Sequence, residues 1–439
     1  MPNGSSTGEM MKAIEMLKFL RQSVVVSLLL GSCIGELHGE SFKVRVSDYP
    51  TNGNPTSAIS TADGKYLFVS VTNVGSPTFT GPDSIAGARH DVVCGIQVFR
   101  VHNERLNAVG FIRLGSAGAN GLAILRGGKT LVVGVGDEGV AFLSISDVLK
   151  GTARPTFADQ GEKAGTFDVV ATPDGQYVFS SNEYGMFHEQ RGNVGVTATH
   201  MDESGAVTHP ETIGHIAVGD VVPSLAISPD GSRIYVATEL VSEKNSPPIA
   251  GAANPALTKR DCVQKKGTPP RGNGFVSVLD VRRAIALKED AILARVASGC
   301  SPVRLVETQD QSELFVSARG DNAVLAFNTL LLESDPEHAF QRALPSGGDA
   351  PVGIRLFAHD HLLAVANSNR FAAAEGTGAI LELTKGSEPV KTWTAGTFPR
   401  NISLGVDGET LFLTNYTSRS VEVVRVPRTE QNDPKPVHP

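Results

Sequence analysis

The sequence predicts an all-β protein, a seven-bladed β-propeller, from three observations. A unit of two short apolar strands joined by a tight turn recurs seven times in the 439 residues. Short segments in which apolar and polar residues alternate, as in β-strands, are frequent and are bounded by glycine, aspartate or asparagine. Helical periodicity is nearly absent. The repeats are spaced near the ~40–50 residues of a propeller blade once insertions are allowed. One such sheet buries too little surface to be stable alone, so the units must pack around an axis.

The repeat is clearest in residues 398–426, where NISL, LFLTN and VEVVRV are separated by an Asp-Gly turn and a polar SRS turn. Asp-Gly tolerates positive φ and therefore closes a tight hairpin. The cores of the seven repeats are DGKYLFVS, GGKTLVVG, DGQYVFSS, DGSRIYVA, DQSELFVS, HDHLLAVA and DGETLFLT, beginning at Asp63, Gly127, Asp174, Asp230, Asp310, His359 and Asp407.

Each core follows a short apolar run and precedes a third strand. The third strands are expected at GIQVFRV, GVAFLSI, GNVGVTAT, GFVSVLDV, AVLAFNT, AILEL and VEVVRV. The last repeat has only three strands, and Ser41–Ser47 (SFKVRVS) is strand-like but belongs to no repeat. We expect this segment to add the outer strand of blade seven, which closes the ring and removes an open edge. The predicted domains are a leader at 1–40, the propeller at 41–428 and a polar tail at 429–439.

The repeats resemble the YVTN-repeat and lactonase-like seven-bladed propellers. The resemblance is carried by LFLTNYTSRSVEVV in repeat seven, by SPDGSRIYVATEL with GFVSVLDV in repeat four, and by LFVSARGDNAVLAFN in repeat five. It covers nearly all of residues 41–426 and implies the fold. Such families include sugar-lactone hydrolases, cycloisomerases and propellers of no known activity, so no single reaction is implied. No motif matches theirs residue by residue, and no catalytic residue is carried over.

The amino-terminal segment predicts export. Residues 16–33 combine the basic Lys18 and Arg21 with a short apolar stretch, as in a secretory signal. The expected location is therefore secreted or periplasmic. Leu30–Cys33 (LGSC) resembles a bacterial lipoprotein cleavage box, so either a lipid anchor at Cys33 or ordinary cleavage downstream fits. No transmembrane segment of ~20 apolar residues is present, and a net charge of −7 argues against nucleic-acid binding.

Three cysteines lie within the repeats. Cys94 belongs to an alternating strand and is expected to be a buried thiol. Cys262 lies in a long connection of repeat four, and Cys300 opens repeat five, so the two could meet on one face. An export signal permits a disulfide. Either a Cys262–Cys300 disulfide or two free thiols fits the sequence.

Four insertions fall between the second and third strands of their repeats. They are Val71–Asp91, Asn182–Gly192, Glu239–Asn273 and Asn367–Gly378. The same position in the repeat places all four on one face, and loops on one face of a rigid scaffold are where binding sites are usually built.

Arginine and asparagine recur in the loops of that face, together with Asp168 and Asn369. Guanidinium forks suit carboxylate or phosphate, so we expect a pocket for a small anionic molecule such as a sugar acid or lactone. The alternative is that these side chains bond neighbouring blades or lie in solvent. The substrate-binding candidates are Arg191, Arg304, Arg319, Asn322, Asn367, Arg370, Arg400, Asn415 and Arg419.

A hydrolase or cyclase also needs a general acid or base. Glu183 and His188, in one loop of repeat three, are the catalytic candidates, although a loop histidine is often merely solvated. No cofactor is expected, because no C-x-x-C-H haem motif occurs and Gly134–Gly139 meets G-x-G-x-x-G without the helix that must follow. No metal is expected at His359 and His361, which lie on the opposite face without a third ligand.

Two functions remain open. The first is a cofactor-independent lactonase-like hydrolase or cycloisomerase that stabilises charge with converging arginines. The second is a non-catalytic propeller that binds a protein or polymer partner, favoured by the basic, proline-rich segment Glu239–Asn273. A carboxylate or histidine at the axis within reach of two arginines would favour the enzyme. An axis plugged by apolar residues would favour the binding protein.

Overall fold

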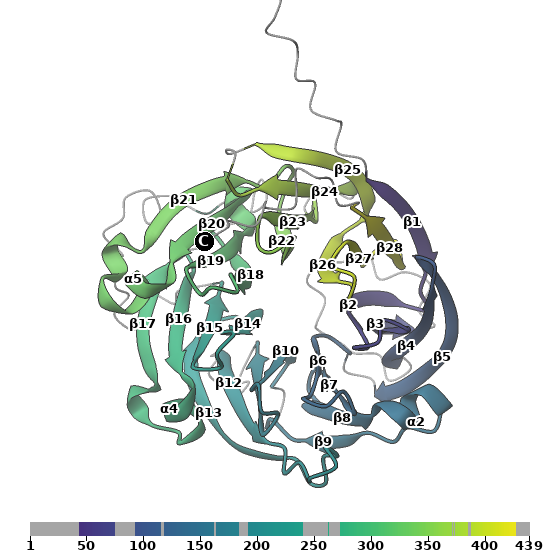
Figure 1. The fold of residues 1–439 in the computed structure, drawn as a ribbon. Helices are drawn as coiled ribbons and strands as arrows, with labels where there is room; N and C mark the ends of the chain where they lie inside the picture. The colour runs from purple at the N-terminus through teal and green to yellow at the C-terminus, as the bar shows by residue number, and fades with distance from the viewer. Residues whose placement is uncertain are drawn as a thin grey trace, which may run out of the picture. The chain divides into compact units, whose positions relative to one another are not determined.

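A computed structural model shows seven four-stranded antiparallel sheets arranged in a ring (Figure 1). The structure describes residues 44–74, 93–115, 118–161, 164–183, 192–239, 262, 273–370, 372, 374–384 and 388–426. The all-β class and the seven-bladed β-propeller are therefore confirmed. The predicted signal at 16–33, Cys33 and the tail at 429–439 lie outside the described residues.

The four strands of each blade follow one another from the axis to the outer rim. Blade 1 contains β2 (Asn54–Ser60), β3 (Tyr66–Val74), β4 (Val93–His102) and β5 (Arg105–Gly115). Blade 2 contains β6 (Leu122–Ile124), β7 (Thr130–Gly134), β8 (Val140–Ser144) and β9 (Thr156–Ala158). Blade 3 contains β10 (Thr166–Ala171), β11 (Tyr177–Asn182), β12 (Gly192–Ala198) and β13 (Glu211–Gly219). Blade 4 contains β14 (Ser224–Ile227), β15 (Arg233–Thr238), β16 (Phe275–Asp280) and β17 (Ile292–Ala297). Blade 5 contains β18 (Pro302–Glu307), β19 (Glu313–Ala318), β20 (Ala323–Asn328) and β21 (Phe340–Pro345). Blade 6 contains β22 (Pro351–Phe357), β23 (Leu362–Asn367), β24 (Glu375–Glu382) and β25 (Pro389–Thr397). Blade 7 contains β26 (Pro399–Leu404), β27 (Thr410–Asn415), β28 (Ser420–Arg425) and β1 (Arg45–Pro50).

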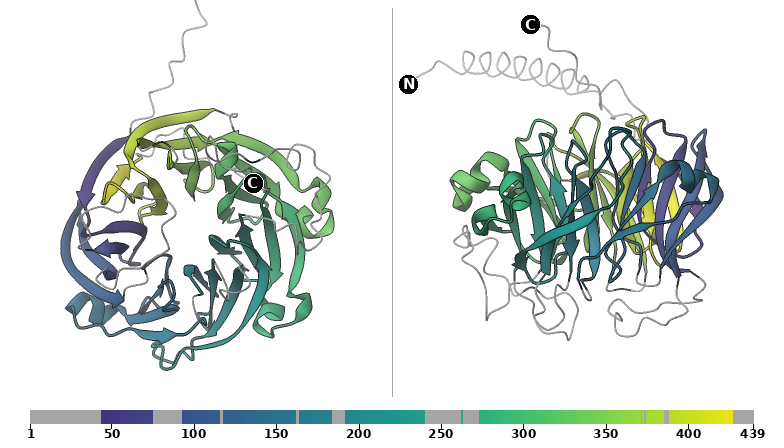
Figure 2. Two further views of the ribbon diagram at one scale, coloured as in Figure 1. Left: turned by 180° about the vertical axis from the view of Figure 1, so that it is seen from behind. Right: turned by 90° about the horizontal axis from the view of Figure 1, so that it is seen from below.

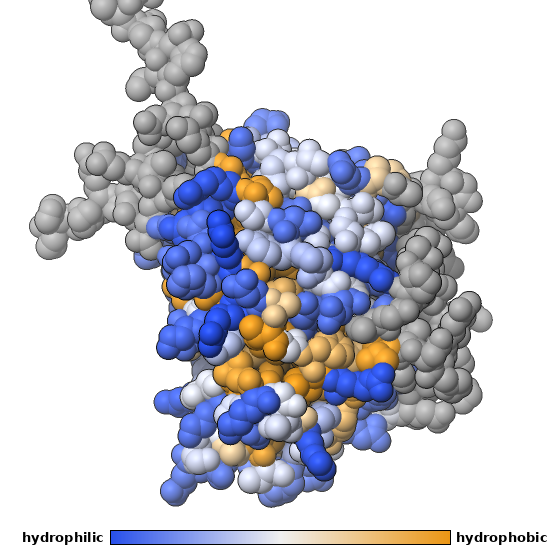
Figure 3. Space-filling model, turned by 90° about the vertical axis from the view of Figure 1, so that its right-hand side faces the viewer, coloured by the Kyte–Doolittle hydropathy of each residue, from blue (hydrophilic) through white to orange (hydrophobic). Residues whose placement is uncertain are grey.

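The ring is closed by the amino-terminal strand, as predicted. Strand β1 pairs antiparallel with β28, from Arg45 opposite Arg425 to Pro50 opposite Ser420. Strand β1 ends at Pro50, three residues after the end of the predicted segment at Ser47, because β28 offers pairing partners as far as Ser420. Pro50 has no N–H to donate and suits the last position of an edge strand. Figure 3 shows apolar side chains among hydrophilic ones on this side of the ring, where Val46 and Val109 are exposed.

The core lies between neighbouring blades. Successive side chains of a strand point to opposite faces of its sheet, so each blade presents apolar residues to both neighbours. Phe179 and Val194 of blade 3, for example, pack with Leu225 and Ile234 of blade 4. Cys94 is buried in the equivalent layer between blades 1 and 2 as a free thiol, as predicted.

The hairpin turns explain why the repeat is readable in the sequence. A hydroxyl two residues before the aspartate donates to its carboxylate, and the N–H two residues after it does the same. In blade 3, Thr172 Oγ1 lies 2.5 Å and Gln176 N lies 3.0 Å from Asp174 Oδ1. Gly175 then adopts a φ of +76°, which favours glycine. Asp63, Asp230 and Asp310 are held in the same way.

In the part of the chain that the structure describes, three short α-helices on the outer rim are absent from the sequence prediction (Figure 2). They are α2 (Ile145–Lys150), α4 (Val281–Ile285) and α5 (Thr329–Ser334), and each directly follows a third strand. Asp280 and Asn328 cap the last two by accepting the N–H of Arg283 and Leu331. Helices this short cannot show a periodicity, so Ile145, Val281 and Thr329 were wrongly expected to extend strands. No helix in the described residues is long and apolar enough to cross a membrane.

Candidate functional site

The candidate site lies where the axis meets one face of the ring. This face carries the connections from second to third strands and those that lead into the inner strands. The described ends of the four long connections lie here, at Val74, Glu183, Glu239 and Arg370. Most of the residues between these ends lie outside the described part of the chain, so the site is built from the strands and short loops.

A bulge at the start of the inner strands aims side chains at this site. The register shifts between Thr166 and Asp168 in blade 3 and between Pro399 and Asn401 in blade 7. Each shift leaves one residue unpaired, Phe167 or Arg400. A bulge re-aims a side chain without ending the strand. A similar shift follows Pro302 in blade 5.

Phe167 stands at the centre of the cluster, with arginines from two other blades stacked on its ring. The guanidinium carbon of Arg400 lies 5.0 Å from the ring centroid of Phe167, and that of Arg304 lies 5.5 Å from it. Arg400 is also 4.8 Å from the ring of Tyr416. Two aromatic rings therefore flank its guanidinium. Blades 3, 5 and 7 meet at this point.

A second aromatic contact extends the cluster toward blade 6. The rings of Phe398 and Tyr416 meet edge to face with centroids 5.5 Å apart, and the Arg370 guanidinium lies 5.8 Å from Phe398. Asn73 of blade 1 donates a hydrogen bond to the Tyr416 hydroxyl at 3.2 Å. Because the tyrosine oxygen accepts this bond, its own proton can point toward a ligand. We call Phe167, Arg304, Arg370, Phe398, Arg400 and Tyr416 the axial cluster.

Burial weakens the preference of Arg400 for its charged form. It lowers the pKa of Arg400 to about 10, because the crowded site disfavours the charged form. Tyr416 and Glu183 oppose the fall, whereas the like charges of Arg304 and Arg370 add to it. No hydrogen bond or ion pair of the Arg400 side chain occurs among the described residues.

Arg304 is only partly satisfied. Its Nη1 donates to the Pro223 carbonyl at 2.7 Å and to the Val303 carbonyl at 3.4 Å, while its Nε is buried without a partner. Its backbone N–H is fixed by the Ser317 hydroxyl at 3.0 Å. Within the described chain, this guanidinium forms no ion pair. A half-buried guanidinium that forms no salt bridge can accept an anion as its partner.

Two carboxylates lie beside the arginines. Burial raises the pKa of Asp168, although Arg304 and the Ser224 hydroxyl, which donates to Asp168 at 2.7 Å, act in the opposite direction. A Cβ at Gly121 would come within 2.2 Å of Asp168 Oδ1, so glycine gives this carboxylate its space. Glu183 is half-buried at the end of β11 and close enough to raise the pKa of Arg400.

The structure gives other candidate residues internal contacts. Asn367 is buried and donates to the Ser346 carbonyl at 2.8 Å. Asn415 is buried and donates to Glu422 at 2.8 Å, and Glu422 also accepts from Trp393 and Gly396. These two amides join neighbouring strands and blades rather than lining an open surface.

In blade 5, the candidate residues Arg319 and Asn322 also bond to other parts of the protein. Arg319 opens the turn η2 (Arg319–Asp321) and pairs with Glu239 of blade 4 at 2.7 Å, with both side chains buried. Asn322 is exposed; it donates to Asp349 at 2.9 Å and accepts from the Ala350 N–H at 2.8 Å.

The remaining candidates divide into two groups. Asn369 donates to the Glu375 carbonyl at 3.1 Å, and Arg419 is half-buried in the turn between β27 and β28. His188 and Arg191 lie outside the described residues. Of the predicted residues, Arg304, Arg370, Arg400, Asp168 and Glu183 come together at the axis.

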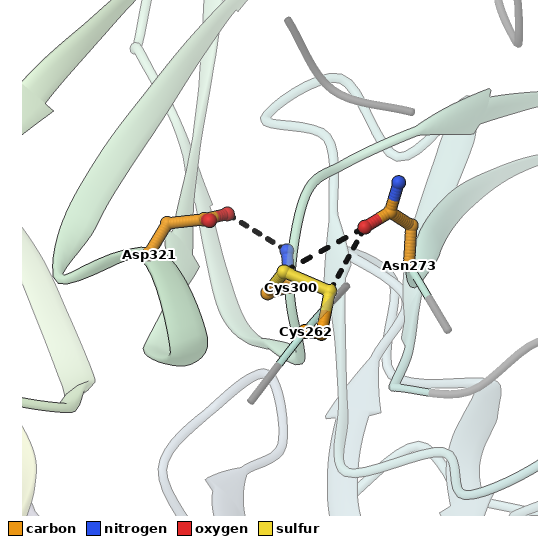
Figure 4. The surroundings of a disulfide bond; sticks show 4 residues. All are labelled: Cys262, Asn273, Cys300 and Asp321. Carbon is orange, nitrogen blue, oxygen red and sulfur yellow. Dashed lines mark hydrogen bonds between the residues drawn. A yellow bond between two sulfur atoms is a disulfide. The ribbon is translucent and has the colours of Figure 1, made fainter. Parts of the chain in front are cut away.

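A disulfide joins Cys262 and Cys300 at the edge of this face (Figure 4). The Cys300 N–H donates to Asp321 at 2.7 Å, and Asn273 Oδ1 lies 2.9 Å from the Cys262 sulfur. The bond ties the long connection of blade 4 to the start of blade 5. The Arg319–Glu239 pair joins the same two blades.

The aromatic members of the axial cluster are functional candidates that sequence reasoning missed. Phe167 lies in the run TFDVVA and Tyr416 in the turn NYTSRS, where both look like ordinary parts of the repeat. Phe167 could have been found because it departs from the repeat: no other blade places an aromatic residue at the corresponding position.

Among the described residues, no group of three or more His, Cys, Asp or Glu could hold a metal ion. The chain matches no protein-family model, and no curated protein matches it significantly. The geometry of the axis is therefore the basis for any functional proposal.

Proposed function

We propose that the protein binds a small organic anion at the axial cluster, on the face that carries the long connections. One observation supports this most strongly. Arg304 and Arg400 reach the same aromatic ring from different blades, and neither forms a salt bridge among the described residues, although Asp168 lies near Arg304 and Glu183 near Arg400. A ligand carboxylate would be a direct partner for both guanidiniums.

The form of the cluster favours a planar anion. Phe167 and Tyr416 flank the Arg400 guanidinium, so its N–H edge is the part left for a ligand. A guanidinium edge matches a carboxylate through two parallel hydrogen bonds. The proposed ligand is therefore a sugar acid or a related carboxylate; the corresponding lactone, its cyclic ester formed by loss of water, is the uncharged relative.

A lactonase-like or cycloisomerase-like reaction is the enzymatic form of this proposal. Asp168 is the observation in its favour, because it lies beside Arg304 and burial raises the pKa of its carboxyl, which favours the protonated form of a general acid. A protonated acid and two guanidiniums could stabilise an oxyanion that forms on a ring carbonyl. Glu183 is the alternative acid or base. We also propose that the protein is exported and that it belongs to the YVTN-repeat, lactonase-like propellers. Both proposals rest on sequence patterns.

Differential scanning fluorimetry with gluconate, glucono-lactone and sugar phosphates tests the proposal. A ligand that binds the native state raises the melting temperature by mass action. We expect gluconate to raise it in the parent protein and in Arg113→Gln, an exposed outer-strand control. Arg400→Gln should abolish the shift. An equal shift in Arg400→Gln would overturn the axial site.

A non-catalytic partner-binding propeller is the second candidate. The aromatic rings of Phe167 and Tyr416 at the axis favour it, because aromatic side chains are enriched where proteins bind partners. The absence of a shift with every small anion, together with capture of one protein by the parent chain, would replace the first proposal with this one.

A further inference from the structure

The junction between the closing strand β1 and the inner strand β2 contains an Asn-Gly pair, Asn52 and Gly53. Asn-Gly is the dipeptide most prone to spontaneous deamidation, because glycine has no side chain to shield its nitrogen from the preceding amide. Asparagine also precedes glycine at Asn3, Asn120 and Asn273. Asn3 lies outside the described residues, so three of the four pairs belong to the described structure.

Deamidation needs a free backbone nitrogen and a free side chain. The glycine nitrogen attacks Cγ of the asparagine and forms a C–N bond, while the Cγ–Nδ2 bond breaks and the proton of the nitrogen leaves with ammonia. Water then opens the cyclic succinimide. Cleavage at Cγ gives aspartate, and cleavage at the backbone carbonyl gives isoaspartate, in which the chain runs through the side chain. A hydrogen bond to the protein slows the first step, because it must break before the atoms can react.

Two of the three pairs are held by such hydrogen bonds. The Gly121 N–H donates to the Phe167 carbonyl at 2.8 Å, and the Asn120 side chain lies 3.4 Å from a backbone carbonyl of the same strand. The Gly274 N–H donates to the Gly299 carbonyl at 2.8 Å. In both pairs the attacking nitrogen is therefore already engaged.

The pair at Asn52 differs. No hydrogen bond of the Gly53 N–H or of the Asn52 side chain occurs among the described residues, and this side chain is exposed. The Thr51 hydroxyl donates to the Gly53 carbonyl at 2.7 Å. The Asn52 N–H donates to Gln97 of blade 1 at 2.8 Å. These bonds order the junction without occupying either reacting group.

We propose that Asn52 is a site of spontaneous deamidation in the folded protein, and that the isoaspartate formed there weakens the closure of the ring. Isoaspartate adds one methylene to the backbone between Asn52 and Gly53, inside the turn that the Thr51 hydroxyl closes. The Thr51 N–H also donates to the Arg419 carbonyl of blade 7 at 2.8 Å. The added methylene therefore lies where the chain passes from blade 7 to blade 1.

The closing strand has no ion pairing across its ladder to offset this change. Its pairing with β28 sets Arg45 opposite Arg425 and Asp48 opposite Glu422 (Figure 1). Like charges directly opposite each other destabilise a pair of strands. Strand β1 therefore depends on its backbone hydrogen bonds and on the junction that follows it.

Peptide mapping by mass spectrometry tests the site. Trypsin places the three pairs in separate peptides, at 46–65, 114–126 and 272–282. During incubation of the folded parent protein at mildly alkaline pH, peptide 46–65 should gain one dalton at least about fivefold faster than the other two, since their glycine N–H groups must first break a hydrogen bond. Chromatography against synthetic standards should resolve its aspartyl and isoaspartyl forms.

Two controls show whether the fold makes the difference. In concentrated urea, which unfolds the protein, the three rates should become similar. In Asn52→Gln the change in the first peptide should be absent and the other two rates should stay the same. Equal rates at the three pairs in the folded protein, or a faster change in either of the other peptides, would overturn the site.

Thermal unfolding tests the effect on ring closure. Incubated parent protein should melt at a lower temperature than fresh protein, whereas incubation should not change the melting temperature of Asn52→Gln. Asn52→Asp carries the new charge without the added methylene and should melt like the fresh parent. An unchanged melting temperature despite isoaspartate at position 52, or an equal loss in Asn52→Asp, would refute the effect of the methylene. Failure of anion binding at the axial cluster would leave all these outcomes unchanged.

Discussion

The buried pair between Arg319 and Glu239 offers a direct test of whether Arg319 serves the fold. Arg319 Nη2 lies 2.7 Å from Glu239 Oε2, and the side chains are only 4% and 6% exposed. Replacing Arg319 with Met keeps most of its volume and removes its charge. Glu239 would then remain buried without its cation. Breaking a buried pair in this way costs about 3–5 kcal/mol of unfolding free energy.

A double-mutant cycle isolates the contribution of the pair. Arg319→Met and Glu239→Gln should each lower the unfolding free energy, by about 3–5 kcal/mol and about 2–4 kcal/mol respectively. The double variant should lose less than the sum, because neither charge is then left alone. We expect a coupling energy of about 2 kcal/mol or more, within the range for residues in contact.

Equilibrium unfolding in guanidinium chloride, followed by circular dichroism and fluorescence, measures these values. Equal m values among the four proteins are required, because a changed m reports a changed unfolded or native state. A stabilising role for the pair is refuted if Arg319→Met is as stable as the parent, or if the two losses simply add. Unchanged stability combined with lost anion binding would instead assign Arg319 to ligand recognition.

Two other predictions concern stability. Replacing Cys262 and Cys300 together by Ser should lower the unfolding free energy by about 4 kcal/mol, since the disulfide spans 38 residues; an unchanged melting temperature would contradict this. Burial raises the pKa of Glu307 to about 7, so the folded state binds this proton more tightly than the unfolded chain. Stability should therefore fall as pH rises from 5 to 8, by at most about 3 kcal/mol, and Glu307→Gln should remove that share of the fall. Melting curves at both pH values check this, and an identical fall in the variant would disprove it.

The fold was readable because its signals are local. The Thr172-x-Asp174 and Ser228-x-Asp230 patterns fix their turns through hydrogen bonds within five residues. All the residues that form such a turn are therefore visible in one short stretch of sequence. Closure by the amino-terminal strand was also predictable from the sequence. The last repeat has only three strands, and the strand-like segment near the amino terminus belongs to no repeat.

The site was less readable because it depends on contacts between distant segments. Arg304 and Arg319 are both arginines of blade 5, yet one reaches Phe167 at the axis and the other pairs with Glu239. Nothing near either residue in the sequence distinguishes them. The stacking of Arg400 depends on a bulge, which sequence alternation does not reveal.

The closing strand has a consequence for how the chain folds. Six blades form from contiguous segments, but β1 must wait until β28 exists before Arg45 can lie opposite Arg425. Contacts between segments so distant along the chain form slowly. Until then, β28 has an unpaired edge that another molecule can use. The first strand of a second copy fits that edge as well as its own, so concentrated refolding favours dimers that exchange β1.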